Sequence, residues 1–525
     1  MMKSTIRTAI HLGSLLLSIY ASSALVGTTE LVSMASDGSE SNGASLTVAI
    51  SANGRYVAFQ SNANNLVADD TNGQYDIFIY DRNNSTTERV SISSNNTQAN
   101  SNSGHPSISA DGRYVAFHSL ANNLVANDTN GSFDIFVHDR NNGTTERLSV
   151  TSENIQGGAD SQHPSISADG RYVAFHSLAN NLVVNDTNDS FDIFVQDRNS
   201  GITERVSISS DSIQGEANSQ HPSISSDGRY VVFHSLATNL VTKDINGAID
   251  IFVYDRNSNT IELVNVANNG SQANDDSAYP SISADGRYVA FDSIANNLVT
   301  SDTNGARDVF IHDRSDKNTE RVSVADDGSQ GDSTSTFASI SADGRYVAFT
   351  SFAVNLVAND TTDICIFNIC PLNILVHDRN KNKTERVSVA SNGTQANDSS
   401  YFHSISANGR YVAFSSDANN LVTDNNSGYT DIFVYDRGIG IDSDSDGVPD
   451  DEDNCPTVQN PGQEDSTPAP PSGEACADEP PDGNPPGDSS GDSSGGSSGI
   501  FGSLMLFIEL VRRRNVAQII SDMWL

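Results

Sequence analysis

The stretch Ser107-Ile-Ser-Ala-Asp-Gly-Arg-Tyr-Val-Ala-Phe117 decides the fold, because its core recurs along the chain. Gly-Arg-Tyr-Val occurs seven times, starting at Gly54, Gly112, Gly170, Gly228, Gly286, Gly344 and Gly409. The first five steps are 58 residues long and the last is 65. A fixed period of this length predicts a repeat architecture.

The length of the chain fits a repeat protein, and its net charge limits the partners that it can bind. Of its 525 residues, about 410 belong to the repeat, which is too long for one compact core and natural for a ring or stack of units. The net charge of −38 argues against nucleic acids and anionic membranes as partners. It suits solubility and cation binding.

Each unit contains four strand-like runs. In the second copy they cover His105–Ser109, Arg113–Ser119, Asp134–Asp139 and Glu146–Thr151. Asp-Gly or Asn-Gly separates the first two runs, which predicts a two-residue hairpin turn with both central residues at positive φ. Four antiparallel strands in each of seven units predict an all-β fold, a seven-bladed β-propeller.

The two ends of the repeat predict how the ring closes. The run Thr29–Ser33 matches the fourth strand of a unit, as in Thr87–Ser91, whereas the last unit stops after its third run, Asp431–Asp436. The N-terminal run is therefore expected to pair beside residues 431–435 and to close a propeller over residues 28–438. Closure protects an otherwise exposed sheet edge.

The repeat resembles a known family in its pattern Ser-x-Asp-Gly-Arg-x-Val-Ala-Phe followed by Asp-Ile-Phe-Val-x-Asp. Over residues 29–438 it is similar to the propeller repeat of the TolB periplasmic protein family, the WD40-like PD40 repeat. This chain has Ala or Ser before Asp-Gly where many such repeats have Pro, and a longer second loop. The resemblance implies the propeller fold. It leaves the activity open, because the family includes binding proteins and accessory domains of hydrolases.

Histidine pairs distinguish the second to fourth units. They are His105 and His118, His163 and His176, and His221 and His234. Counting back from the turn, where Ala110 faces Arg113, places His105 directly opposite His118, and the same count holds in the other two units. The six side chains are expected in an arc around the channel mouth on the long-loop face. A metal or acidic-ligand site and inert packing at the rim are the two interpretations.

Other repeated features are interpreted as scaffold. Asp-Arg ends the third run in all seven units, as at Asp139-Arg140, which predicts a repeated ion-pair and hydrogen-bond network. The long loop reads Asp128-Thr129-Asn130-Gly131 before Asp134, and resembles part of a calcium loop. Turn chemistry explains the same composition, so calcium in these loops stays open.

Residues 1–24 have the features of a secretory signal peptide. Lys3 and Arg7 precede an apolar run, and small residues allow cleavage after Ala24; a retained membrane anchor is the alternative. Export permits disulfides. The four cysteines form two local pairs, Cys365 with Cys370 and Cys455 with Cys476. The first pair encloses an apolar insert in the sixth unit, either a contact site or a stapled loop.

An acidic module follows the propeller at residues 441–478. Its candidate calcium ligands are Asp442, Asp444, Asp446, Val448, Asp450 and Asp453, with Val448 contributing its carbonyl oxygen and Gly447 the sharp turn. Together with Asp453-Asn454-Cys455-Pro456, the stretch resembles a thrombospondin type 3 repeat, although the second calcium motif of such repeats is missing. A disordered acidic linker is the alternative.

Residues 479–499 are rich in Pro, Gly, Ser and Asp and form a flexible linker. In the tail, residues 500–525, an apolar run, Ile500–Val511, precedes a basic cluster, Arg512–Arg514. This order resembles a GlyGly-CTERM sorting signal and implies a transient or C-terminal membrane association; an amphipathic tail is the alternative.

These features predict an exported, calcium-binding, non-catalytic binding or scaffold protein of the bacterial envelope, in the periplasm, on the outer surface or secreted. A monomer is expected to bind a protein or polysaccharide on the loop-rich propeller face. The alternative is a secreted hydrolase with its active site at the propeller mouth, although the chain contains no Gly-x-Ser-x-Gly motif.

Overall fold

The computed structural model describes residues 27–358, 360, 371–423, 425 and 427–439. The predicted signal peptide, the four cysteines, the acidic module, the linker and the tail lie outside these residues. No helix long and apolar enough to cross a membrane occurs in the described part of the chain.

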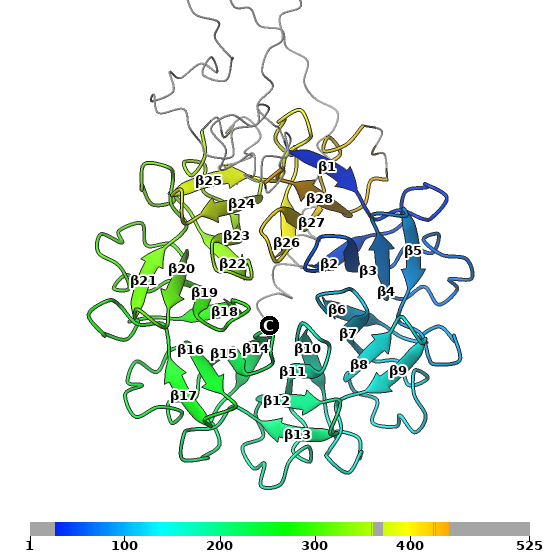
Figure 1. The fold of residues 1–525 in the computed structure, drawn as a ribbon, viewed down its shortest axis with the longest axis horizontal. Helices are drawn as coiled ribbons and strands as arrows, with labels where there is room; N and C mark the ends of the chain where they lie inside the picture. Colours follow the sequence, from blue (N-terminus) through cyan, green and yellow to red (C-terminus); the bar gives the residue numbers. More distant parts are fainter. Residues whose placement is uncertain (1–26, 359, 361–370, 424, 426, 440–525) are drawn as a thin grey trace, which may run out of the picture. The chain divides into compact units, whose positions relative to one another are not determined.

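The described residues form seven four-stranded antiparallel sheets arranged as a ring (Figure 1). We call these sheets blades 1 to 7; blade 1 contains β2–β5, and blade 7 contains β26–β28 together with β1. Within blades 1 to 6 the strands pair in sequence order from the channel outward, and in blade 7 β26, β27 and β28 are followed by β1 at the outer edge. The predicted all-β, seven-bladed propeller is confirmed.

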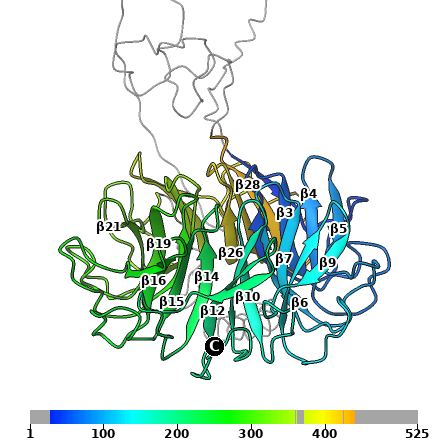
Figure 2. The ribbon, with the colours of Figure 1, turned by 60° about the horizontal axis from the view of Figure 1, so that its bottom comes forward.

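The innermost strand of each blade runs along the channel, as Figure 2 shows for β10 and β14. These first strands are β2 (Ser45–Ile50), β6 (Ser103–Ile108), β10 (Ser161–Ile166), β14 (Ser219–Ile224), β18 (Ser277–Ile282), β22 (Ser335–Ile340) and β26 (Ser400–Ile405). The second strands are β3 (Tyr56–Ser61), β7 (Tyr114–Ser119), β11 (Tyr172–Ser177), β15 (Tyr230–Ser235), β19 (Tyr288–Ser293), β23 (Tyr346–Ser351) and β27 (Tyr411–Ser416).

The third strands are fully buried except at the end of β28. They are β4 (Asp76–Asp81), β8 (Asp134–Asp139), β12 (Asp192–Asp197), β16 (Asp250–Asp255), β20 (Asp308–Asp313), β24 (Asn373–Asp378) and β28 (Asp431–Asp436). The outermost strands are β5 (Thr86–Arg89), β9 (Thr144–Arg147), β13 (Ile202–Arg205), β17 (Thr260–Leu263), β21 (Asn318–Arg321), β25 (Lys383–Arg386) and, in blade 7, β1 (Thr28–Leu31).

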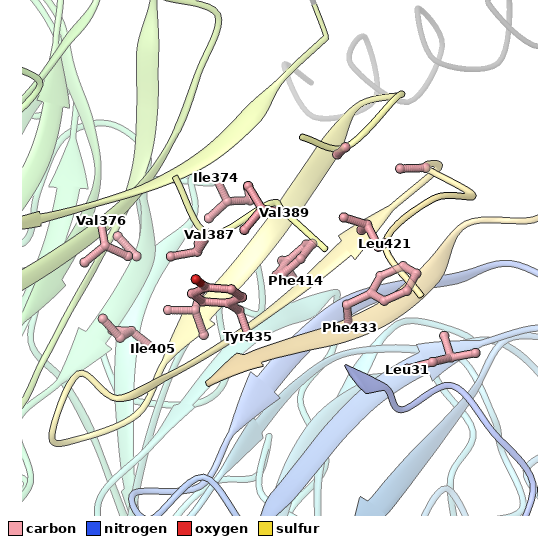
Figure 3. Packing of buried hydrophobic residues seen from close by; sticks show 14 of the residues in the cluster. Leu31, Ile374, Val376, Val387, Val389, Ile405, Phe414, Leu421, Phe433 and Tyr435 are labelled. Atoms are coloured by element: carbon pink, nitrogen blue, oxygen red, sulfur yellow. The ribbon is translucent and has the colours of Figure 1, made fainter. Parts of the chain in front are cut away.

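The N-terminal strand closes the ring, as predicted. β1 pairs antiparallel with β28, so that Thr29 lies opposite Tyr435 and Leu31 opposite Phe433. Figure 3 shows Leu31 in the cluster that contains Phe433 and Tyr435. The same cluster includes Val387 from blade 6, so closure also buries apolar surface against the neighbouring blade.

Each blade is apolar on both faces because it packs between two neighbours. One core cluster joins Ile77 and Ile79 of blade 1 to Phe117 and Phe136 of blade 2. The two phenylalanine rings stack at a centroid distance of 5.9 Å. This two-sided packing explains why the runs are nearly continuously hydrophobic, whereas a sheet with one solvated face alternates.

The sequence analysis placed several strand boundaries and one turn incorrectly. The first strand of blade 2 begins at Ser103, before His105, and the fourth ends at Arg147, well before Thr151. In the turn, Gly112 has a φ of 74°, whereas the φ of Asp111 is not positive. Asp111 instead accepts hydrogen bonds from the Ser109 hydroxyl (2.7 Å) and from the Arg113 backbone N–H (2.9 Å). This side-chain turn removes the need for a second left-handed residue.

The repeated Asp-Arg pair forms the predicted network and links neighbouring blades. Asp139 accepts two hydrogen bonds from Arg113 of its own blade, at 2.9 and 2.7 Å. Arg140 donates to Glu88 of the preceding blade, and its guanidinium lies 4.4 Å from the ring centroid of Tyr56 there. Each blade is therefore attached to the one before it by both charge and ring contact.

Candidate functional site

Counting inward from the hairpin turn correctly pairs Ser107 with Ala116, but a β-bulge then shifts the register. His118 lies opposite Gly104, so the predicted direct opposition of His105 and His118 is wrong by one residue. The same shift places Gln162 opposite His176 and Gln220 opposite His234. In these three blades proline follows the bulged histidine, and it has no N–H for the ladder.

The bulge turns the first-strand histidines toward one another across blades. His105, His163 and His221 have φ values of 49°, 50° and 51°. The ring centroids of His105 and His163 are 4.0 Å apart, and those of His163 and His221 are 4.4 Å apart. The row continues from His221 to Tyr279 at 4.9 Å and from Tyr279 to Phe337 at 4.5 Å. We call these five side chains the ring ladder.

The second-strand histidines lie behind the ring ladder. The centroid distances are 5.0 Å from His105 to His118, 5.0 Å from His163 to His176 and 5.1 Å from His221 to His234. All six predicted histidines therefore come together in one arc, through neighbouring blades and in spite of the shifted register. His118, His176 and His234 are buried, whereas the three ladder histidines are partly exposed.

Hydrogen bonds between blades fix the orientation of two of the buried imidazoles. The backbone N–H of His221 donates to Nδ1 of His176, and that of Tyr279 to Nδ1 of His234, both at 3.3 Å. Because Nδ1 accepts, the proton of each neutral ring resides on Nε2. Among the described residues, the buried Nε2 of His176 has no hydrogen-bond partner.

A cavity of about 280 Å³ lies inside the arc. Imidazoles, aromatic rings, prolines and small residues line it; they are Thr47, Val48, His105, Pro106, His163, Pro164, His221, Pro222, Tyr279, Pro280, Phe337, Ala338, Ser339, Phe402 and His403. No Asp, Glu, Lys or Arg belongs to this lining. The sequence analysis did not identify His403 or the four prolines as lining residues. The prolines could have been found, because a proline follows the bulged residue in four consecutive blades.

Burial keeps the imidazoles of the arc uncharged at neutral pH. It lowers the pKa of His105 to about 4 and, with a smaller contribution from other imidazoles, that of His176 to about 3. The pKa of His163 lies well below its ordinary value, first through burial and then through neighbouring rings. His118 and His221 are shifted in the same direction for the same reasons.

Among the described residues, one ion pair lies near the ring ladder, and it is buried behind the ladder. Asp292 is 0% exposed and lies 2.5 Å from Nη1 of Arg307. Asp292 also accepts the N–H of Phe337 at 3.0 Å, which repeats the hydrogen bonds of His176 and His234 in the next blade. Burial raises the pKa of Asp292, and Arg307 opposes that rise. The pair thus orients the ladder without adding net charge to the cavity.

The opposite end of the channel is encircled by backbone hydrogen bonds. At each first hairpin the turn residue donates its N–H to the carbonyl of the equivalent residue in the next blade, from Ala52 through Ala110 onward. The last of these bonds returns from Ala407 to Ala52, at 3.1 Å. This closed belt holds the blades together at the turn end, whereas the long loops lie at the end with the histidine arc.

The remaining predicted site residues lie outside the described residues. They are Asp442, Asp444, Asp446, Val448, Asp450, Asp453, Cys365, Cys370, Cys455 and Cys476. In the part of the chain that is described, no three His, Cys, Asp or Glu side chains form a group that could hold a metal ion. The metal interpretation of the histidine arc therefore gains no support from its geometry.

Comparisons with known proteins found similar chains only among solved structures. No protein-family model and no curated protein matches the chain. Among solved structures, TolB from Acinetobacter baumannii shares 16% identity, over 65% of this chain and 62% of that one, with a TM-score of 0.35. A TolB-type protein from Agrobacterium tumefaciens shares 18% identity over 53% and 80% of the two chains, with a TM-score of 0.34. The β-propeller domain of the Trilobed protease from Pyrococcus furiosus shares 13% identity over 75% and 95%, with a TM-score of 0.45. These similarities assign neither a ligand nor an activity to this chain.

Proposed function

We propose that this chain is a non-catalytic binding protein that holds an uncharged segment of a polysaccharide or protein at the loop-face mouth of its propeller channel. The observation that carries this proposal is the cavity of about 280 Å³, lined by neutral imidazoles, aromatic rings and prolines. Binding sites combine apolar walls with a few polar groups that orient the ligand. Ring faces suit flat apolar surfaces, and each neutral imidazole offers one donor and one acceptor.

Exposed aliphatic side chains also occur on two of the histidine-bearing blades. In the long loops, Val184 of blade 3 is 86% exposed and Ile245 of blade 4 is 87% exposed. The counterparts in blade 5 are polar, Thr300 and Thr303. Exposed apolar side chains in the long loops support a ligand that is larger than the cavity and extends onto the loop face.

The hydroxyl groups of the cavity wall are already engaged, which favours binding over catalysis. Thr47 donates to Oε1 of Gln60 at 3.0 Å, and Ser339 accepts the N–H of Ile405 at 3.4 Å. Neither hydroxyl is hydrogen-bonded to an imidazole among the described contacts. A hydrolase that acts through a serine or threonine needs such a nucleophile and base pair.

The segments outside the described residues complete the proposal. The features of residues 1–24 favour export, and the acidic module at 441–478 favours calcium binding through Asp442, Asp444, Asp446, Val448, Asp450 and Asp453. The propeller would then face the periplasm, the outer surface or the medium, and the metal-stabilised module would connect it to the tail.

Replacement of the ladder histidines tests the ligand site. The variant His105→Asn/His163→Asn/His221→Asn is expected to weaken ligand binding at least about tenfold, because three ring faces are removed from the wall. Asn tolerates the positive φ of these positions. Neutral glycan arrays and uncharged peptide arrays are compared with the wild-type and variant full chains.

His138→Gln is the matched control for that experiment. His138 is a buried histidine of a third strand, hydrogen-bonded through Nδ1 to Thr145 at 2.9 Å, and blade 3 carries Gln196 at the same position. It is not part of the cavity lining. Unchanged binding by the triple variant, or equal loss in His138→Gln, would contradict a ligand site at the ladder.

Calcium titration tests the acidic module. Asp444→Ala/Asp446→Ala is expected to remove one class of calcium site from the full chain, since two carboxylate ligands are lost. Isothermal calorimetry with CaCl₂ measures the stoichiometry. The same heat from the wild type and the variant would exclude calcium binding by this module.

A further inference from the structure

Serine hydroxyls join the innermost strands of neighbouring blades. The backbone N–H of Ile166 in blade 3 donates to the hydroxyl of Ser107 in blade 2, at 3.1 Å. Equivalent bonds of 3.1 to 3.4 Å occur at five other blade junctions; they are Ile224 to Ser165, Ile282 to Ser223, Ile340 to Ser281, Ile405 to Ser339 and Ile50 to Ser404. We call these six bonds the serine collar.

The junction between blades 1 and 2 lacks this bond. Blade 1 carries Ala49 where the other six blades carry serine, so the hydroxyl is missing opposite the N–H of Ile108. This N–H points away from β7, because the residues on either side of it, Ser107 and Ser109, are the ones that pair with β7. No acceptor for the Ile108 N–H occurs among the described hydrogen bonds.

The gap in the serine collar lies next to the cavity. Val48, which precedes Ala49, and Pro106, two residues before Ile108, both belong to the cavity lining. Ile108 is partly exposed, whereas the six isoleucines of the serine collar are buried, at 7–9% exposure. A backbone N–H needs an acceptor, and at this position a ligand in the channel can supply one.

An apolar rim occupies the same five blades as the ring ladder. Its members directly follow the second strands of blades 2 to 6; they are Leu120, Leu178, Leu236, Ile294 and Phe352. The N–H of each donates to the carbonyl of the residue before the first strand, which places the rim at the loop-face end of the channel-lining strands. Leu236 is 43% exposed and Ile294 is 41% exposed. Blades 1 and 7 carry Asn62 and Asp417 at this position.

From this arrangement we infer that the mouth binds an extended, uncharged polypeptide segment, whose backbone carbonyl accepts the N–H of Ile108. The apolar side chains of the segment contact the ring ladder and the apolar rim. This inference rests on the proposed ligand site and narrows its ligand class. An extended peptide brings carbonyl groups that need donors, and it brings aliphatic side chains, which a neutral glycan lacks.

Closing the gap in the serine collar tests the inference. Ala49→Ser copies the serine of the other six blades, and its hydroxyl is expected to accept the Ile108 N–H in place of the ligand. Loss of one such hydrogen bond should weaken peptide binding about tenfold. The probes are capped, uncharged peptides of Leu, Pro, Ala and Gly on an array, next to an array of neutral glycans. Calorimetry with the full chain then measures the affinity for the peptide that the wild type binds most strongly.

Hydrogen–deuterium exchange, followed by mass spectrometry, observes the same donor directly. The fragment that contains Ile108 is expected to exchange more slowly in Ala49→Ser than in the wild type, and more slowly in the wild type with peptide bound than without it. Equal exchange in all three samples would show that the Ile108 N–H is not a free donor, and would overturn the inference.

Ala52→Ser is the matched control. It adds the same hydroxyl to blade 1 at the turn end of the channel, where blade 4 already carries Ser226, and Ala52 joins the belt through its backbone alone. It should leave peptide binding unchanged. If Ala49→Ser also binds like the wild type while the triple histidine variant does not, Ile108 has no role and the ligand site still stands. Binding of glycans but of no peptide would overturn the polypeptide class, and binding of neither would contradict the proposed function itself.

Discussion

Gly228→Ala is expected to lower the free energy of unfolding by roughly 2–5 kcal/mol, the largest effect of any single substitution considered for this chain. Gly228 has a φ of 73°, where a Cβ adds backbone strain of about 1–2 kcal/mol. That Cβ would also lie 2.1 Å from Cδ2 of Tyr172 in the preceding blade. Arg256 holds this ring at 4.3 Å from its guanidinium, so the ring cannot move away freely.

Gly247→Ala isolates the backbone contribution. Gly247 has a φ of 66°, but no atom lies within 4 Å of a Cβ at this position. Its expected cost is about 1–2 kcal/mol. Urea unfolding at neutral pH measures both variants against the wild type. Equal destabilisation by the two substitutions would show that the close packing of tyrosine on glycine between blades contributes nothing.

Acid is expected to destabilise the propeller through the histidine arc, and His176→Gln should relieve part of that effect. The pKa of His176 is about 3 in the folded state, whereas an unfolded histidine titrates near its model value of 6.5. Below the unfolded pKa, only the unfolded chain takes up this proton, so stability falls as the pH decreases from 6.5 toward 3. At about pH 4.5, this single imidazole lowers the free energy of unfolding by about 3 kcal/mol.

The comparison with His176→Gln isolates the imidazole from the carboxylates that titrate in the same range. Burial raises the pKa of the third-strand carboxylates, such as Asp192, and these groups favour the folded state as the pH decreases. Burial likewise raises the pKa of Asp292 beside the arc. Because these groups are common to both proteins, they cancel in the difference.

Glutamine is chosen because blade 1 has Gln60 at this position, and its amide oxygen can accept the N–H of His221. Urea unfolding at about pH 7.5 and about pH 4.5 gives the change in stability of each protein. The variant should lose less by about 3 kcal/mol. If both proteins lose the same stability, His176 is not buried as a neutral imidazole.

Local sequence was sufficient for the architecture, because the repeat supplies the same evidence seven times. The period, the turn residues and the unpaired run Thr29–Ser33 predicted seven blades and the strand that closes them. The interblade ion pairs were also predictable, since Asp139-Arg140 and its equivalents recur without exception. These features depend on contacts within a blade or between identical neighbours, and a periodic sequence reports such contacts directly.

The pairing register of the first and second strands at the channel could be established only from the tertiary structure. Counting from the turn failed at His105, because a β-bulge adds one residue to the first strand without an unambiguous signal in a single copy. The six histidines nevertheless meet, because the bulge aims three of them across blade boundaries. Side chains from all seven blades line the cavity, and no local pattern states which residues of separate units share a wall.

Two carboxylates of blade 4, Asp244 and Asp250, show the same division. Asp244, Asp250 and Leu263 can be read from the sequence, but each residue type is common in a loop or strand. In blade 3 the arginine that ends the fourth strand lies 3.3 Å from both equivalent carboxylates, whereas Leu263 ends β17, so only the fold shows that this ion pair is missing from blade 4. Composition and period can establish the scaffold, but burial and charge balance are properties of neighbours in space, so they could be read only from the folded ring.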